Sequence, residues 1–414
     1  MMGWFHKKIS PLQPIWVMAV MMLMSCTAYA LTQDIYRAEA YLFTLGLLAV
    51  FVCGCALIRL LRLGDPYLFM IVFSLIVVSL TMLFRLNFQI AIKQALWFLG
   101  GMVGYFFVAT IYKYWKKPRK LWVVCPVICA ALFVITLVFG KEVNGAKNWL
   151  YFMEDRISVQ PSEFIKLFYI FSLAALFTSE QKHKAKRRLI PVLLVYFHMG
   201  CLALQNEFGL AVLLFLVYIV MAYTNGRDKL FLFFHVVFVS LAGLVGYRFI
   251  SHVQSRVAMW RDPFSDPSGK GYQILQSLFA LTSGGFMGVG YGEGSPQVIP
   301  EVSSDFIFAA ICEEFGLMGG IAVILLYFLL CYRALKIALM VTNRFHKLLA
   351  VGLGSCIALQ AFIIIGGVTK MIPMTGITLP FVSYGGSSLV SCFIAMGILQ
   401  GISARKGEIA YEIG

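Results

Sequence analysis

Charged side chains are scarce in this chain: they make up 13% of its 414 residues, whereas 60% of the residues are hydrophobic. Soluble domains carry about 25% charged residues, so the composition excludes an ordinary soluble protein, and the apolar excess excludes a disordered one. A hydrocarbon core about 30 Å thick needs about 20 apolar residues per helix. Apolar runs of that length follow one another almost end to end, so we expect a polytopic membrane protein.

Familiar catalytic and metal-binding signatures are also absent. The ten cysteines lie in or beside the apolar runs and show neither a disulfide framework nor zinc spacing; even the Cys53-x-Cys55 pair falls within one run. The six histidines are scattered, and His198 and His235, inside runs, are expected to be packing residues. There is no Walker loop, nucleophile elbow or strand-rich region. Any chemistry must therefore come from polar residues set among membrane helices.

The apolar runs predict an all-α polytopic membrane protein with about twelve transmembrane helices and a large extracellular loop between the ninth and tenth. The predicted spans are 13–32, 40–62, 67–84, 95–113, 121–139, 163–179, 190–205, 209–224, 229–249, 306–331, 347–367 and 386–403. The first span, which follows Lys7 and Lys8 and precedes Ala28-Tyr29-Ala30, also resembles a cleavable signal peptide. We expect it to be retained.

The net charge of +15 follows the predicted topology. With both termini cytoplasmic, the inner segments hold 22 of the 34 Lys and Arg residues but only five of the 19 Asp and Glu residues. This asymmetry is the positive-inside pattern of a multi-pass protein in a cytoplasmic membrane. The basic clusters are therefore expected to set the topology and to contact anionic membrane lipids, and nucleic-acid binding is not expected.

Polar residues near membrane depth are costly and often functional. The first outward-facing cluster combines Trp149 with Gln160-Pro-Ser-Glu163 and Lys166. Glu163 and Lys166 are three residues apart, hence on one helix face, and are expected to pair. The pair can line a substrate cavity or form a simple salt bridge at a helix entry. The second cluster, Gln205-Asn-Glu207-Phe-Gly209, places a carboxylate either at a cavity or in a hairpin turn facing water.

The third cluster is the long segment 250–304, which contains eight glycines and four prolines. Two Asp-Pro steps, at Asp262 and Asp266, are expected to fix a turned backbone that carries two carboxylates near Arg256. An acid beside cations suits either general-base chemistry or a solvated ion pair. The glycines suit either anion binding by backbone amides or tight turns. Connections of this length are usually functional.

The fourth cluster, the irregular segment from Pro373 to Ser388, lies directly before the last predicted helix. Non-helical backbone near membrane depth is tolerated where it is buried in protein or lines a wet cavity.

Three motifs together resemble the SEDS family (shape, elongation, division and sporulation), the group of the RodA, FtsW and SpoVE proteins. They are D-P-x-x-D-P-x-G-x-G-Y-Q at Asp262 to Gln273, D-F-I-F-A-x-x-x-E-E at Asp305 to Glu314, and L-P-F-x-S-Y-G-G-S-S at Leu379 to Ser388. The resemblance runs from about residue 145 to residue 405, with the motifs in family order.

This resemblance implies a peptidoglycan glycosyltransferase that polymerises lipid II at the outer face of the cytoplasmic membrane of a bacterium. The 4-hydroxyl of one sugar would displace undecaprenyl pyrophosphate from another, with inversion. It also implies a class B penicillin-binding protein as the transpeptidase partner, and it leaves open whether a divalent cation takes part. A hydroxyl nucleophile needs a positioned base, and a departing pyrophosphate needs cationic or metal stabilisation.

The resemblance implies Asp266 as the general base, because it matches the second acid of the family motif, with Asp262 shaping the loop. The residues that it implies in substrate binding are Trp149, Glu163, Lys166, Glu207, Arg256, Tyr272, Gln273, Gln276, Ser277, Glu301, Asp305, Ser383, Tyr384, Gly385, Gly386 and Ser387.

The chain departs from the family pattern at two of these places. Glu207 stands in Q-N-E-F-G where the family usually has Q-P-D-L-G, and Asn148 replaces the customary arginine before Trp149. The family usually has about ten spans, with three before the motif that corresponds to Gly145-Ala-Lys-Asn-Trp149, whereas five are predicted before it here. We therefore expect an N-terminal region 1–139 with two extra spans, a catalytic core 140–405 that includes the extracellular loop 250–304, and a cytoplasmic tail 406–414.

Two other functions are compatible with the sequence. A flippase for a lipid-linked precursor would need polar residues across the whole membrane thickness, whereas the four clusters gather on one predicted side. A noncatalytic scaffold in a division or elongation complex would leave Asp266 dispensable.

Overall fold

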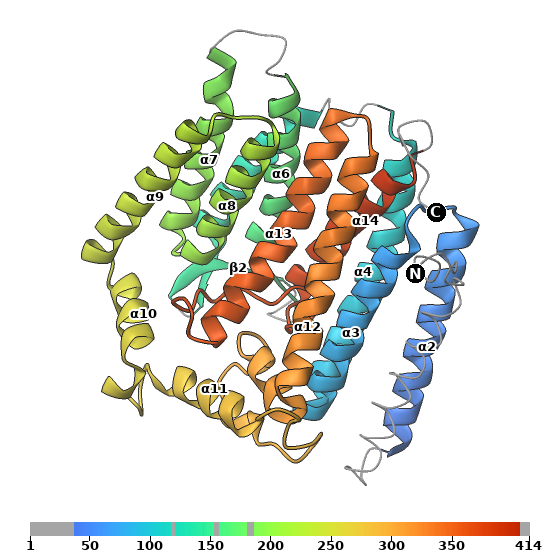
Figure 1. Cartoon of the computed structure of the whole chain (residues 1–414), viewed down its shortest axis with the longest axis vertical. Helices are drawn as coiled ribbons and strands as arrows, with labels where there is room; N and C mark the ends of the chain where they lie inside the picture. The colour runs from blue at the N-terminus through green and yellow to red at the C-terminus, as the bar shows by residue number, and fades with distance from the viewer. Residues whose placement is uncertain (1–36, 117–120, 144, 153–156, 180–185, 406–414) are drawn as a thin grey trace, which may run out of the picture.

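The computed structural model describes residues 37–116, 121–143, 145–152, 157–179 and 186–405, which are mostly helical (Figure 1). Eight of these helices are long and apolar enough to cross a membrane. They are α2 (Arg37–Leu60), α3 (Pro66–Leu86), α4 (Phe88–Tyr114), α6 (Ser162–Ser179), α9 (Lys229–Phe249), α12 (Ile307–Met340), α13 (Arg344–Val368) and α14 (Gly386–Ser403). Three shorter apolar helices are α5 (Val124–Phe139), α7 (Lys186–Leu204) and α8 (Phe208–Thr224).

Eleven of the twelve predicted apolar spans coincide with these helices, while the first, 13–32, lies outside the described residues, as does the tail 406–414. The predicted and observed ends agree to within about four residues except at two places. α4 begins at Phe88 rather than at residue 95, because the Asn87 side chain caps the helix by accepting hydrogen bonds from the amides of Gln89 and Ile90. α12 continues to Met340 rather than ending at 331.

The inner helices of the bundle are largely buried, as in α3, α6 and α13, whereas α9 is almost wholly exposed. Leu232 is the one described residue of α9 that is buried. An apolar helix with so little protein around it fits contact with lipid acyl chains, because the hydrocarbon core replaces the missing protein neighbours.

A small antiparallel sheet adds strands to the expected all-helical fold. Its order is β1 (Lys141–Val143), β2 (Ala146–Phe152) and β3 (Ile157–Val159), and it connects α5 to α6. Of the first polar cluster, Trp149 thus lies on β2, whereas Glu163 and Lys166 lie on α6. In Figure 1 β2 lies at the lower part of the bundle, on the side of α10 and α11.

The long segment 250–304 is folded rather than extended. It contains α10 (Ser251–Arg261), the 3₁₀ turn η3 (Pro263–Ser265), α11 (Tyr272–Ser283) and the turn η4 (Pro296–Val298). Its glycine-rich part is hydrogen-bonded to α12 beside a kink in that helix. The amides of Val289 and Gly290 donate to the carbonyls of Glu313 and Glu314. The kink is at Gly316, whose φ of 66° favours glycine.

The opposite end of the bundle is strongly basic and held by hydrogen bonds between helix ends. Lys113 donates to the carbonyl of Leu61 over 2.8 Å, and Arg405 donates to that of Tyr112 over 2.9 Å. Arg333, near the end of α12, pairs with Asp65 before α3. The two ends of the molecule therefore differ in charge as well as in fold.

Candidate active site

A cavity of about 370 Å³ lies at the end of the bundle that carries the sheet, with walls from segments far apart in the chain. Its lining residues are Trp97, Val143, Ala146, Asn148, Trp149, Tyr151, Ser158, Gln160, Glu163, Asn206, Glu207, Gly209, Leu210, Arg256, Glu301, Ser304, Asp305, Gln360, Thr375, Gly376, Ile377, Thr378, Tyr384, Gly385, Gly386 and Ser388. All four polar clusters of the sequence contribute to it.

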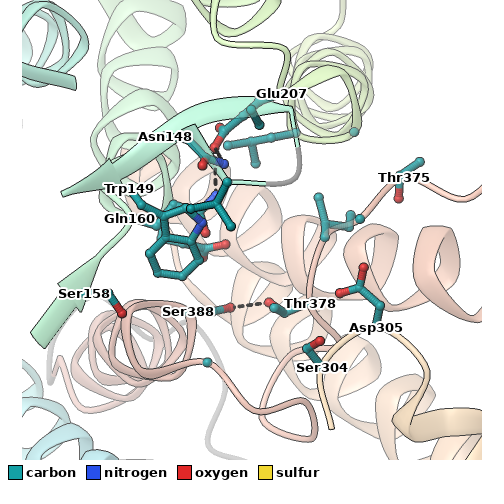
Figure 2. A pocket seen from close by; sticks show the side chains of 18 of the residues that line it. Asn148, Trp149, Ser158, Gln160, Glu207, Ser304, Asp305, Thr375, Thr378 and Ser388 are labelled. Carbon is teal, nitrogen blue, oxygen red and sulfur yellow. Dashed lines mark hydrogen bonds between the residues drawn. The ribbon is translucent and has the colours of Figure 1, made fainter. Parts of the chain in front are cut away.

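One wall of the cavity centres on Glu207, at the turn before α8 (Figure 2). Its Oε1 accepts hydrogen bonds from the Asn148 side-chain amide, from Gln160 Nε2 over 2.8 Å and from Ser162 Oγ over 3.1 Å. Its Oε2 and the Oδ1 of Asn148 are buried without a partner among the described residues. Burial raises the pKa of the Glu207 carboxyl, although the three hydrogen bonds act in the opposite direction.

Trp149 follows Asn148 on β2 and lines the same wall. Figure 2 shows Trp149, Asn148, Gln160 and Glu207 together on one side of the cavity, and Asp305 and Thr375 on the other. The first wall therefore offers an aromatic face and amide groups, a combination suited to uncharged polar ligands.

The other wall holds Arg256, the only basic residue among the described residues that line the cavity. Its Nη1 donates to the carbonyl of Met374 over 3.2 Å, which ties α10 to the segment before α14. Asp305 and Glu301 lie on this side. Burial raises the pKa of Asp305 to about 6, with a smaller contribution from Glu301, and Arg256 opposes the shift. This wall combines one cation with two carboxyl groups.

The predicted pair of Glu163 and Lys166 is confirmed. Lys166 Nζ lies 2.5 Å from Glu163 Oε2 and donates to Gln360 Oε1 over 3.1 Å. Ser391 Oγ also donates to the Glu163 carboxylate over 3.1 Å. Both members of the pair are buried, but only Glu163 lines the cavity, since Lys166 points to its partners within the bundle.

The segment before α14 is shaped by serines. Ser383 Oγ donates to the carbonyl of Ser304 and accepts from the amide of Leu379, and Ser387 Oγ accepts from the amide of Gln160 over 3.0 Å. Neither serine lines the cavity, whereas Tyr384, Gly385 and Gly386 do. A side chain at Gly386 would not fit, because its Cβ would lie 2.3 Å from the Trp97 ring.

Asp266, the predicted base, does not line this cavity. It lies after η3, partly exposed, and its Oδ2 accepts a hydrogen bond from the amide of Lys270 over 2.9 Å. Asp262 caps η3 by accepting from the amide of Phe264 over 3.0 Å, which is the loop-shaping contact expected of it. The two aspartates thus share one loop beside α10.

Four further predicted residues lie on α11, outside the cavity: Tyr272, Gln273, Gln276 and Ser277. Ser277 is buried and donates to the carbonyl of Ile274 over 2.8 Å. Of the predicted substrate-binding residues, the structure brings together Trp149, Glu163, Glu207, Arg256, Glu301, Asp305, Tyr384, Gly385 and Gly386.

Several lining residues were missed by sequence reasoning. Trp97 on α4 and Gln360 on α13 lie within apolar runs, where no local pattern separates them from packing residues. Gln160 belongs to the first polar cluster and Asn148 precedes its Trp149, but neither was predicted as a site residue; their polarity near membrane depth was the available signal. Within the described ranges, no group of three or more His, Cys, Asp or Glu side chains is placed to hold a metal ion. A divalent cation here would need substrate oxygens as further ligands.

A bundle of apolar helices with a polar, carboxyl-bearing cavity at one end defines a polytopic membrane protein with an enzyme-like site. The chain belongs to the FtsW/RodA/SpoVE family of cell cycle proteins, whose sequence model matches residues 56–408. The match begins near the end of α2, so α3, α4 and α5 precede β2 within it.

Named relatives are similar over most of their length. The peptidoglycan glycosyltransferase RodA of Mycobacterium tuberculosis is 35% identical over 366 residues, covering 82% of this chain and 78% of the relative. The stage V sporulation protein E of Bacillus subtilis is 37% identical over 326 residues, covering 75% and 86%. This similarity places the chain among the peptidoglycan glycosyltransferases, as a multi-pass bacterial membrane enzyme of cell-wall synthesis.

Two solved structures share the fold. A chain from a peptidoglycan synthase complex that coordinates polymerization and crosslinking has 25% identity and a TM-score of 0.68, and the match covers 82% of this chain and 97% of that one. The rod shape determining protein RodA of Thermus thermophilus has 22% identity and a TM-score of 0.61, with 82% and 96% covered.

Proposed function

We propose that the chain polymerises lipid II into glycan strands, with undecaprenyl pyrophosphate as the leaving group and inversion at the anomeric carbon. The observation that carries this proposal is the polar cavity at one end of an apolar bundle. An amphiphile can keep its lipid tail in the bilayer and place its sugar and pyrophosphate in such a cavity, whereas a soluble substrate would not need the membrane.

The proposed orientation puts the cavity at the outer face of the cytoplasmic membrane. The end away from the cavity carries basic residues with few acids: Arg59, Arg62, Lys113, Lys116, Arg227, Lys229, Arg333, Lys336, Arg344, Lys347 and Arg405. Such an end is retained in the cytoplasm under the positive-inside rule. The cavity end, where Glu163, Glu207, Glu301 and Asp305 lie, then faces outward.

We assign the two walls different parts of the substrate. The pyrophosphate lies toward Arg256, because an anion needs a cation and Arg256 is the one cation among the described residues that line the cavity. The sugar lies against Trp149 and the amides around Glu207. A second anion there would meet the buried Glu207 carboxyl and, among the described residues of this wall, no cation. Tyr384, Gly385 and Gly386 close the space between the walls.

Asp266 is proposed as the general base that takes the proton from the attacking 4-hydroxyl. Its loop is continuous with α10, whose Arg256 reaches the cavity, and its carboxylate is partly exposed and forms no salt bridge with the described side chains. Because Asp266 lies outside the cavity, the acceptor sugar must extend from the cavity onto this loop. Tyr272, Gln273, Gln276 and Ser277 on α11 would then contact the acceptor strand.

The transpeptidase that crosslinks the strands is proposed to be a class B penicillin-binding protein bound to this chain. The similarity to a chain of a synthase complex that coordinates polymerization and crosslinking supports this partner. Assays should therefore contain both proteins.

The test compares two aspartates of the same loop in the purified complex supplied with lipid II. Asp266→Asn should lower the polymerisation rate by about a hundredfold or more, the usual contribution of a general base. Asp262→Asn is the matched control: asparagine also caps η3, so this variant should keep most of the activity.

Three outcomes would change the proposal. Normal polymerisation by Asp266→Asn, together with loss in Asp305→Asn, would move the base into the cavity. Transfer of labelled lipid II between leaflets without polymer would favour a transporter. Activity in neither assay, with the partner present, would favour a scaffold.

A further inference from the structure

A second cavity, of about 350 Å³, lies at the basic end of the bundle between the end of α2 and the start of α3. It shares no residue with the candidate active site, and α3 runs the length of the bundle between them. Its walls are mainly apolar and are formed by Cys55, Ile58, Arg59, Arg62, Leu63, Gly64, Pro66 and Met70.

Two arginines stand at this cavity without a counter-charge. Arg59, in the last turn of α2, and Arg62 are both exposed, and neither forms a salt bridge with the described side chains. Asp65, the nearest acid in the sequence, is already paired with Arg333, whose Nε donates to its Oδ2 over 2.7 Å. The apolar cavity therefore carries a net positive charge.

The backbone around the cavity is held in place by contacts that require no ligand. Lys113 Nζ donates to the carbonyl of Leu61 over 2.8 Å and to that of Arg62 over 3.3 Å. Gln400 donates to the carbonyl of Leu63, and the amide of Asp65 donates to Ser403 Oγ over 3.1 Å. These contacts fix the turn in which Arg62 adopts a positive φ of 49°. The cavity is therefore preformed, and Lys113 adds a third positive charge near it.

We propose that this cavity binds an anionic phospholipid of the membrane. The lipid phosphate would lie between the guanidinium groups of Arg59 and Arg62, which match phosphate geometry, and an acyl chain would lie against Cys55, Ile58 and Met70. A neutral lipid would bring no negative charge to the two arginines, and a free phosphate would leave the apolar walls in contact with water. Only an anionic amphiphile satisfies both features.

The first experiment measures lipid binding to the detergent-purified full chain by native mass spectrometry, with phosphatidylglycerol and phosphatidylcholine as probes. Phosphatidylglycerol should bind more tightly. The double variant Arg59→Ala/Arg62→Ala should weaken its binding by about thirtyfold, since each basic residue contributes to the attraction. The matched control is Lys116→Ala/Lys229→Ala, which removes two exposed charges from the same end without touching the cavity. It should change the affinity less than threefold.

A second variant keeps both arginines and fills the cavity. Cys55→Phe should weaken binding of phosphatidylglycerol about tenfold or more, because the acyl chain loses its place, and it keeps the proposal testable if the double arginine variant does not fold. A phosphatidylglycerol with a photoactivatable acyl chain should label residues 55–70 in the wild type and not in Cys55→Phe.

Several results would overturn the lipid site. They are unchanged phosphatidylglycerol affinity in both cavity variants, an equal loss in the lysine control, or photolabelling confined to other helices. Complete competition by inorganic phosphate at an equal concentration would assign the arginines to a free anion instead.

Discussion

Asn148 and Glu207 are two of the residues at which the chain departs from its family's pattern, and they contact each other directly. Where the resemblance implies an arginine and an aspartate, this chain has a neutral amide and a longer acid. The side-chain amide of Asn148 donates to Glu207 Oε1, and Gln160 and Ser162 supply two further donors. The two departures are therefore one change in a single hydrogen-bonded cluster.

This cluster predicts different outcomes for two substitutions of Glu207. Glu207→Gln keeps an oxygen for the three donors and places its amide at the unpartnered Oε2 position, so the unfolding temperature should change little. Glu207→Leu leaves the three donors without an acceptor, which costs about 1–3 kcal/mol for each buried group. This variant should therefore have a clearly lower unfolding temperature. Thermal unfolding in detergent measures both variants. Equal losses would contradict the hydrogen-bond account.

Asp305 predicts a pH dependence of substrate binding. Below about pH 6 its carboxyl is neutral, because burial raises its pKa to about 6, and it then does not offset the positive charge of Arg256 that attracts the pyrophosphate. Above that pH the carboxylate repels the anion by about 1 kcal/mol at an intermediate effective dielectric. The KM for lipid II should therefore rise roughly fivefold between about pH 5 and 7.

The matched variant is Asp305→Asn, which removes the titrating group. Its KM should stay level over the same interval if the protein folds as the wild type does. A rise of KM in this variant equal to that of the wild type would show that Asp305 is not the titrating group.

At the scale of elements, the kink of α12 contacts the glycine-rich part of the segment 250–304. Gly316 has a φ of 66°, and a Cβ added to it would lie 2.3 Å from the amide nitrogen of Gly288. Gly316→Ala should therefore destabilise the protein by about 2 kcal/mol or more, from backbone strain and crowding. Polymerisation should also fall, because α11 connects directly to the displaced segment.

Gly243→Ala on α9 provides the control for this substitution. Nothing lies within 4 Å of a Cβ at Gly243, so alanine should be neutral or slightly stabilising there. Chemical unfolding in detergent compares the two variants. A Gly316→Ala protein as stable as Gly243→Ala would show that the kink tolerates an ordinary residue.

At the scale of the whole molecule, the two ends of the bundle should face opposite sides of the membrane. A cysteine at Ser265, exposed beside Asp266, should react with a membrane-impermeant maleimide in intact cells, because the cavity end is proposed to face outward. A cysteine at Lys116, exposed at the basic end, should react only after the membrane is permeabilised. Labelling of both variants is compared with that of the unsubstituted chain. The reverse pattern would contradict the proposed topology.

The apolar runs and the distribution of basic residues determined most of the architecture by themselves. Burial in a bilayer is a local property of about 20 consecutive residues, so α9 and α14 were predicted at their observed ends. Likewise Glu163 and Lys166 had to share a helix face, because their spacing alone brings them together. Short strands such as β2 escaped notice, since three to seven residues carry too weak a pattern.

Only the tertiary structure decided which polar residues meet. Trp97 and Gln360 line the cavity although each lies in an apolar run, whereas Asp266 lies outside it despite its motif. Likewise, Asn148 and Glu207 are far apart in the sequence and adjacent in space. Such contacts depend on how helices pack and where connecting segments fold back, and no local spacing encodes this information. The sequence identified the kinds of residue available to the site, and packing selected the ones that share a cavity.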